Sequence, residues 1–166
     1  MKLAYKGKLI NLLNKRIRLP NGRIFDFEII IHPGAVLIIP FLSKEKVIIL
    51  RQFRPVINSY LYELPAGTLK KGESPLFCCQ RELIEETGFS AKKFKKLGEI
   101  YPVPGYSTEK VRIYKALGLK PERICREKDE VISVKIASKP EVRRLFKAGK
   151  ITDAKTICAF AMCGWL

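Results

Sequence analysis

Three glutamates that lie close together in the sequence are the side chains best suited to chemistry. They are Glu82, Glu85 and Glu86, within residues 67–89. In a helix each residue turns by about 100°, so these carboxylates share one face, where they repel each other. A hard divalent cation such as Mg2+, which takes oxygen ligands and binds phosphates, would offset that repulsion. A solvated acidic face is the alternative interpretation.

The flanking residues predict a helix around these glutamates. The hydroxyl of Ser74 can cap free amides, and Pro75 is tolerated at the first helical position. Gly88 is a matching stop. On the face opposite the glutamates, an apolar group is expected, consisting of Leu76, Phe77, Leu83 and Ile84.

The whole segment reads GTLKKGESPLFCCQRELIEETGF and follows the pattern G-x5-E-x7-R-E-L-I-E-E-T-G-F. This pattern resembles the Nudix box, the signature of the Nudix hydrolases, at every specified position. The resemblance implies a loop, a helix and a loop that bind a divalent metal and cleave nucleoside diphosphates linked to another group. It covers 23 of the 166 residues and does not name a substrate.

The resemblance also assigns roles by position. The implied metal ligands, catalytic through the metal, are Glu82, Glu85, Glu86 and the carbonyl of Ala66. The implied cofactor is Mg2+, with Mn2+ as an alternative. The residues expected to shape the box are Gly67, Glu73, Arg81 and Gly88. Arg81 would pair with Glu73 to fix the loop against the helix, and Gly67 would permit a tight approach.

Other segments resemble the ADP-ribose pyrophosphatase branch of that family. They are residues 32–36 (HPGAV), 51–55 (RQFRP), 63–67 (ELPAG) and 102–109 (PVPGYSTE). Pro104 follows Gly88 by 16 residues, as is typical of the branch. The branch implies substrate contacts by Arg51 and Arg54, and guanidinium groups suit bidentate phosphate binding. For both arginines, a surface charge at a strand end is the alternative.

The segment after the box is expected to form a loop over the site. Glu109 matches a loop glutamate that, in the branch, lies over the metal and accepts a proton from water or binds a metal; an exposed loop acid is the alternative. Pro104 and Gly105 are expected to shape this loop first and to line the substrate second. His32 is the only histidine, and its place beside a Pro-Gly turn predicts a structural role.

The resemblance therefore predicts Mg2+-dependent hydrolysis of ADP-ribose to AMP and ribose 5-phosphate. Within the same class, the alternatives are another nucleoside diphosphate sugar or a dinucleotide, such as GDP-mannose or NADH. A different class is a non-catalytic, basic RNA-binding module with the Nudix fold. The net charge of +16 favours that module, whereas the intact glutamates of the box oppose it.

Composition sets the outer limits. The 166 residues, 47% of them apolar, suffice for one buried core. No apolar run approaches the roughly 20 residues that span a bilayer, and the start lacks the core of a signal peptide, so we expect a cytoplasmic protein without membrane contact. The five cysteines have no zinc-type spacing and are expected to be free. The basic residues are scattered, so no dedicated nucleic-acid surface is expected.

Polarity patterns predict strands first and helices later. Strands are expected at residues 16–19, 23–31, 36–41, 47–53, 96–101, 111–119 and 131–136, with helices from Ser138 to Gly149 and from about Asp153. The fold class is α/β, and the resemblance sharpens it to an α/β/α sandwich with a mixed sheet. Residues 1–31 are expected to form antiparallel strands for homodimerisation, and residues 32–166 the hydrolase domain.

Overall fold

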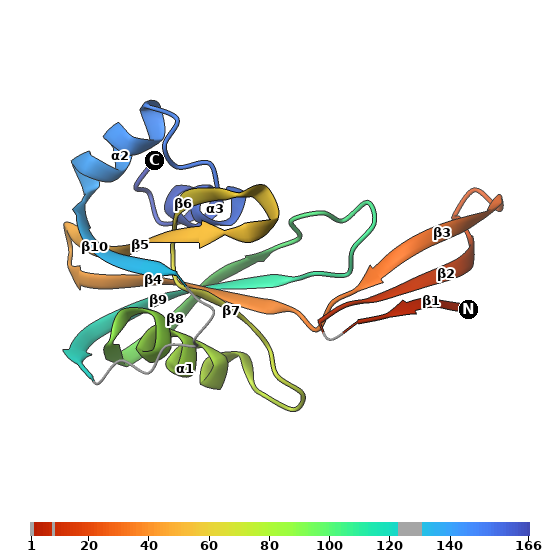
Figure 1. Ribbon diagram of the computed structural model, residues 1–166, viewed down its shortest axis with the longest axis horizontal. Coiled ribbons are helices and arrows are strands. Elements are labelled where there is room, and N and C mark those ends of the chain that lie inside the picture. Colours follow the sequence, from red (N-terminus) through yellow and green to blue (C-terminus); the bar gives the residue numbers. More distant parts are fainter. Residues whose placement is uncertain (1, 8, 123–130) are drawn as a thin grey trace.

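A mixed β-sheet forms the centre of the protein in the computed structural model, which describes residues 2–7, 9–122 and 131–166 (Figure 1). The main strand order is β10-β5-β4-β9-β8, with β6 beside β5 and β7 beside β4. The bounds are β4 Ala35–Ser43, β5 Lys46–Arg54, β6 Ser59–Glu63, β7 Ala66–Thr68, β8 Phe89–Ile100, β9 Val111–Pro121 and β10 Ile132–Ser138. Only the β4–β9 pair is parallel among the pairs in this described sheet.

A separate three-stranded antiparallel sheet precedes the main one. It consists of β1 Lys2–Lys6, β2 Asn11–Arg18 and β3 Ile24–Ile31. In Figure 1 it extends away from the rest of the protein. The predicted hairpin around residues 20–22 is confirmed, because the amide of Gly22 donates to the carbonyl of Leu19 and β2 pairs with β3. Strand β1 was not among the predicted strands.

Helices cover both faces of the main sheet. They are α1 Pro75–Thr87, α2 Lys139–Lys147 and α3 Ala154–Met162, and a short 3-10 turn, η1, spans Pro55–Ile57. In Figure 1, α1 lies on one face, whereas α2 and α3 lie on the other. The predicted α/β/α sandwich is therefore confirmed. The predicted start of α1 is also correct, since the Ser74 hydroxyl accepts a hydrogen bond from the amide of Phe77.

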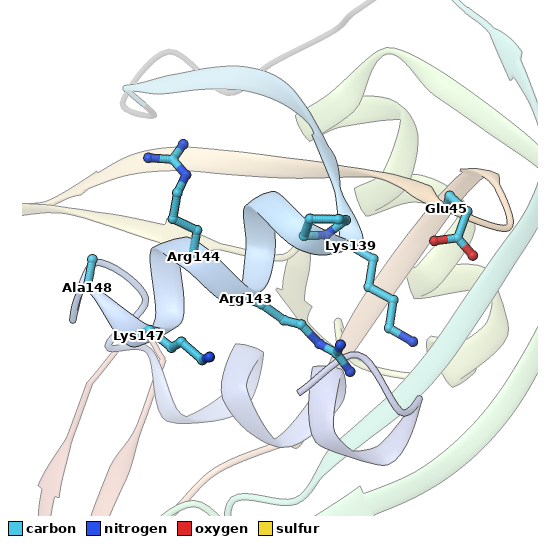
Figure 2. Close-up of a pocket in the computed structure, with 7 residues that line it drawn as sticks. Glu45, Lys139, Arg143, Arg144, Lys147 and Ala148 are labelled. Carbon is cyan, nitrogen blue, oxygen red and sulfur yellow. The ribbon is translucent and has the colours of Figure 1, made fainter.

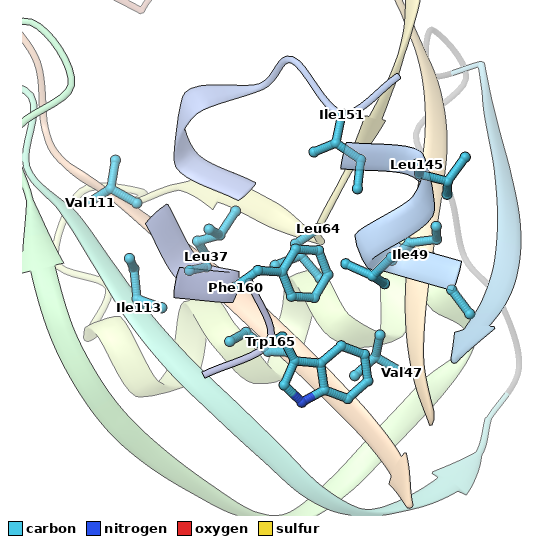
Figure 3. Packing of buried hydrophobic residues seen from close by; sticks show 14 of the residues in the cluster. Leu37, Val47, Ile49, Leu64, Val111, Ile113, Leu145, Ile151, Phe160 and Trp165 are labelled. Carbon is cyan, nitrogen blue, oxygen red and sulfur yellow. The ribbon is translucent and has the colours of Figure 1, made fainter. Parts of the chain in front are cut away.

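Strand β4 explains why two cores form. Its run of apolar residues is buried on both faces, as expected for a central strand. Because side chains alternate along a strand, Leu37 and Ile39 join the core under α2 and α3, whereas Val36 and Ile38 join the core under α1. Figure 3 shows the first of these cores, where the Phe160 and Trp165 rings stack at 5.7 Å between centroids.

The residues of α1 that pack against the sheet differ from those that the sequence predicted. Leu83 is buried as expected, but Leu76 and Phe77 are exposed. The small thiols of Cys78 and Cys79 fill the contact with the sheet instead. Burial raises the pKa of Cys78 to about 12, so its thiol is protonated and unreactive near neutral pH.

Two further expectations concern the cysteines and membranes. The cysteines in the described residues, which are Cys78, Cys79, Cys158 and Cys163, are free as predicted. Cys125 lies outside the described residues. Within the described part of the chain, no helix is both long enough and apolar enough to cross a membrane.

Candidate active site

A cleft of about 910 Å3 lies where the box meets the N-terminal strands. Strand β5 ends at it with Arg54, strand β7 contributes Ala66 and Gly67, and α1 contributes Glu82 and Glu85. The other side is formed by Leu9, Asn11 and Ile31 of the N-terminal region. The cleft is more polar than the interior because carboxylates and guanidinium groups line its floor, and this polarity suits a charged ligand.

Gly67 and Glu82 are in unusually close contact. A Cβ atom added to Gly67 would lie 1.8 Å from Oε1 of Glu82 and 1.9 Å from its Cδ. Real carbon and oxygen atoms do not approach so closely, so only glycine leaves room for this carboxylate. Glu82 is itself 8% exposed. The predicted tight approach at Gly67 is therefore present, and the side chain that approaches is Glu82, one of the three glutamates.

Glu86 is the most buried of the three glutamates, with 2% of its surface exposed. Its Oε2 accepts a hydrogen bond of 2.9 Å from the amide of Ala66. This bond ties α1 to β7 and fixes the carboxylate beside the Ala66 backbone. Glu86 is not among the described residues that line the cleft, but Ala66, to which it is bonded, is. Burial of an ionised carboxylate is costly unless it is paired, hydrogen-bonded or bound to a cation.

Arg81 connects the loop of the box to the helix. Its Nε lies 2.8 Å from Oε1 of Glu73, which confirms the predicted pair. Its Nη1 also lies 2.6 Å from Oε1 of Glu82 and 2.9 Å from Oε2 of Glu85. The guanidinium thus offsets part of the repulsion between the two helix carboxylates.

Arg54 is held by a residue that the sequence analysis did not single out. Its Nε and Nη2 donate to the two carboxylate oxygens of Glu63, at 2.8 and 2.5 Å. Glu63 is 2% exposed, whereas the Arg54 side chain is 39% exposed and lines the cleft. Glu63 is the main cause of the raised pKa of Arg54, to which Glu86 adds through its charge. The positively charged guanidinium of Arg54 is therefore held in one position at the wall of the cleft.

The family of this chain follows from a comparison with known domains. Residues 31–160 match the model of the NUDIX domain. The chain belongs to the Nudix family. A curated relative, the ADP-ribose pyrophosphatase of Bacillus subtilis, is 36% identical over 157 residues, which cover 93% of this chain and 85% of the relative. This match extends the likeness to the N-terminal strands.

Two further proteins are similar to this Nudix chain. A GDP-mannose pyrophosphatase of Escherichia coli O1:K1 / APEC is 32% identical over 133 residues, covering 75% of this chain and 69% of the relative. Among solved structures, one described as the crystal structure of ADP compounds hydrolase has a TM-score of 0.84 at 23% identity. It covers 98% of this chain and 88% of its own, so the fold is shared over nearly the whole length.

The structure does not bring every predicted residue of this Nudix chain to the cleft. Arg51 lies three residues before Arg54 on β5, so it points to the opposite face of the strand. Its guanidinium lies 4.0 Å from the centroid of the Tyr60 ring. Of the described residues, those that line the cleft do not include Arg51, and its substrate contact stays a prediction.

The loop with Pro104, Gly105 and Glu109 is attached to the end of β3. The amide of Ile30 donates to the carbonyl of Tyr106, and the amide of Thr108 donates to the carbonyl of Ile30. These three predicted residues are not among the described residues that line the cleft. Their roles as base and substrate contacts stay predictions. His32 has the expected structural contact, since its Nδ1 accepts from the amide of Gly34.

The donor set of the cleft fits a hard divalent cation. Glu82 and Glu85 line the cleft, and Glu86 lies beside it at the amide of Ala66. All their donor atoms are oxygens, which Mg2+ and Mn2+ prefer. Within the described residues, no group of three or more His, Cys, Asp or Glu side chains has a ready-made metal geometry. The ion pairs of Arg81 with Glu82 and Glu85 hold these two carboxylates, which is one reason why they do not converge on a common point.

The pair between Glu73 and Arg81 predicts an acid-sensitive stability. Hydrogen bonds from Arg81 lower the pKa of Glu73 from 4.5 to about 2. A depressed folded-state pKa stabilises the protein above the unfolded value of 4.5, and this contribution is lost as the pH falls toward about 2. We expect Glu73→Gln to lower the urea midpoint near neutral pH. The deficit should shrink in acid, and a deficit independent of pH would contradict the argument.

Support behind the cleft comes from residues that the sequence analysis missed. Thr156 of α3 accepts a hydrogen bond from the amide of Leu64 through its Oγ1, at 2.9 Å. Asp153 caps α3 by accepting from the amide of Thr156. These contacts fix the segment between Glu63 and Ala66 from behind. The capping role of Asp153 was readable from the sequence, whereas the contact of Thr156 with Leu64, 92 residues away, was not.

Proposed function

We propose that this Nudix chain hydrolyses the diphosphate linkage of ADP-ribose to AMP and ribose 5-phosphate, with Mg2+ as cofactor. One observation carries the proposal. A single cleft is lined by the nearly buried Glu82, by Gly67, whose lack of a side chain leaves room for Glu82, and by Arg54, whose guanidinium is held by Glu63. This combination supplies a place for a cation and a place for a phosphate anion.

The chemistry of a diphosphate requires neutralisation of negative charge before water attacks phosphorus. A divalent cation bound by Glu82, Glu85 and Glu86, with the carbonyl of Ala66, would polarise a phosphoryl oxygen and favour ionisation of water. Arg54 would neutralise and orient the second phosphate, because its fork is held by Glu63 and loses little freedom on binding. Mn2+ is the alternative ion.

The proton from the attacking water needs an acceptor. We propose Glu109 for this role, as the branch resemblance implies. Its loop is fixed to β3 by two backbone hydrogen bonds, on the same edge of the molecule as the N-terminal part of the cleft. Closure of this loop around a bound diphosphate would bring Pro104 and Gly105 to the substrate. A positioned base contributes about 100- to 10,000-fold to the rate.

The choice of ADP-ribose is supported by the relatives. The 36% identical relative that matches 93% of this chain is an ADP-ribose pyrophosphatase. The GDP-mannose pyrophosphatase matches less of the chain at lower identity, and makes GDP-mannose the second candidate substrate. NADH is a further candidate. Both alternatives would use the same metal site. NADH differs from ADP-ribose only in the group beyond the diphosphate, whereas GDP-mannose differs in both the base and the sugar.

The substrate proposal is tested by kcat/KM for ADP-ribose, GDP-mannose and NADH, measured with Mg2+ under one set of conditions. We expect the highest value for ADP-ribose, with AMP and ribose 5-phosphate as products. A higher value for GDP-mannose would transfer the assignment to that sugar and leave the metal site intact. Absence of cleavage with all three would favour the non-catalytic, basic module.

Arg54 provides a test of substrate contact. Arg54→Lys keeps the charge beside buried Glu63 but removes the two-pronged geometry. We expect the KM for ADP-ribose to rise about tenfold, which corresponds to about 1.4 kcal/mol of lost binding. The thermal midpoint, measured in parallel, separates binding from folding. A lower midpoint with an unchanged KM would mean that Arg54 serves only to neutralise Glu63.

We also propose that residues 1–31 mediate homodimerisation and that residues 32–166 form the hydrolase domain, in the cytoplasm. The N-terminal sheet exposes a group of large apolar side chains, namely Leu3, Tyr5, Leu9, Ile24 and Phe25. Large apolar side chains that remain exposed in one chain are available to be buried against a second copy. Leu9 also lines the cleft, so a second copy bound to this sheet would lie close to the substrate.

The dimer predicts a measurable mass. Sedimentation velocity at micromolar concentration should give twice the 19.0 kDa of one chain. Ile24→Lys places a charge on the exposed apolar group and should shift the mass toward one chain. Gln80→Lys, which adds the same charge at an exposed position of α1 outside this sheet, is the control. A monomeric wild type would remove the dimer proposal without affecting the hydrolase assignment.

A further inference from the structure

Helix α2 carries a stripe of cations that the catalytic proposal does not use. Lys139, Arg143 and Lys147 are spaced by four residues, so they share one face of the helix. With Arg144 and Glu45 they line a hollow of about 810 Å3. Figure 2 shows Lys139 and Arg143 extending from the same side of α2, with Arg144 directed to the other side. Like charges at this spacing destabilise a helix unless an anion offsets them.

Acidic side chains nearby do little to offset this charge. Glu141 is engaged by Lys135 at 2.8 Å and by Arg144 at 3.8 Å. Arg143 is held in place because its Nε donates to the carbonyl of Trp165 at 2.8 Å. In the described part of the chain, no carboxylate lies within 4.0 Å of the cationic groups of Lys139, Arg143 or Lys147.

A second basic hollow, of about 590 Å3, adjoins the first. Its cations are Lys44, Lys95 and Lys115. Lys95 and Lys115 are directly opposite each other in the β8–β9 register, where like charges destabilise a sheet. The turn between β4 and β5 joins the hollows, since Lys44 lines one and Glu45 lines the other.

The two hollows form one surface, which we name the basic band. Trp165 also links them, because it lines the second hollow and accepts the hydrogen bond from Arg143 of the first. The basic band consists of Lys44, Lys95, Lys115, Lys139, Arg143 and Lys147. None of these six residues lines the catalytic cleft. A ligand on the band would therefore be bound separately from the substrate.

We propose that the basic band binds the phosphodiester backbone of a single-stranded nucleic acid. Six cations over two adjoining hollows match a ligand with repeated charges better than a single small anion. The net charge of +16 would add long-range attraction. The cations are scattered in the sequence, and only the fold gathers them, which is why sequence analysis predicted no such surface.

The test uses a fluorescent oligouridylate of about 20 nucleotides and fluorescence anisotropy at several salt concentrations, with the full chain. The test variant is Arg143→Gln/Lys147→Gln. The control is Arg23→Gln/Lys120→Gln, which removes the same charge from exposed residues that line neither hollow of the band. For single strands each lost phosphate contact lowers the salt slope by about 0.7, so the test variant should lose about 1.4 from the slope. Its Kd at about 0.1 M salt should rise on the order of tenfold.

Each outcome is decisive. The proposal requires that the wild type binds, that the test variant is weakened and that the control is weakened much less. Equal weakening of both variants would reveal attraction to net charge alone and overturn the site. Absence of binding by the wild type would also overturn it. If poly-glutamate competes as well as unlabelled oligouridylate, the band accepts acidic polypeptide and the nucleic-acid assignment is wrong. ADP-ribose hydrolysis, measured on the same variants, should be unchanged.

Discussion

Replacement of Glu86 by glutamine should abolish most hydrolysis while the protein remains folded. The carboxylate is 2% exposed, lies beside Ala66 of the cleft lining, and is proposed to bind the cation. Glutamine has the same shape, and its side-chain oxygen can still accept the hydrogen bond from the Ala66 amide. The variant therefore keeps this hydrogen bond and loses the negative charge. We expect kcat to fall on the order of 100- to 1,000-fold.

The matched control for this variant is Glu99→Gln. Glu99 is an exposed glutamate of β8 that pairs with Lys96 and Lys110 at the surface. Exposed pairs of this kind contribute little to stability, so this variant should keep both its fold and its activity. Thermal melts of both variants would establish folding. A folded Glu86→Gln protein with wild-type kcat would remove Glu86 from the metal site.

A single methyl group on Gly67 should have a comparable effect. In Gly67→Ala the new Cβ would lie 1.8 Å from Oε1 of Glu82, so the carboxylate or the β7 backbone must move. Gly67 does not have a positive φ, so the effect is steric rather than conformational. We expect kcat to fall on the order of 100-fold, because displacement of about 1 Å at a reacting centre has effects of this size.

Gly98→Ala separates damage at the site from damage to the fold. Its Cβ would lie 2.3 Å from Cε of Met162, which is the end of a flexible side chain outside the cleft. Both glycines lack a positive φ. The Gly98 variant should therefore melt at a slightly lower temperature and keep its activity. If Gly67→Ala retained wild-type kcat and metal dependence, the close contact between Gly67 and Glu82 would not be required for catalysis.

Local signals explain which parts of the site could be predicted. Ser74 and Gly88 determine the ends of α1 through their own capping contacts, so the position of the glutamates on the helix followed from sequence alone. The pair between Arg81 and Glu73 followed from the box. The requirement for glycine at position 67 became specific only when folding placed Glu82 against it.

Other features depend on strand pairing and were missed for that reason. Glu63 meets Arg54 because the short strand β6 pairs with β5. A signal for the intervening turn existed in Asn58, which adopts the left-handed conformation that asparagine tolerates. The parity of strand positions also separates Arg51 from Arg54, so their divergence could have been predicted once β5 was assigned.

The central claim is that a metal bound by the box glutamates drives hydrolysis of ADP-ribose. The most direct measurement is the initial rate with protein freed of metal by a chelator, followed as Mg2+ is added back, with mass-spectrometric identification of the products. The account predicts negligible hydrolysis without the ion and a saturable rise to full activity, with AMP and ribose 5-phosphate in equal amounts. Full activity in the absence of divalent metal, or no hydrolysis at any Mg2+ concentration, would contradict it.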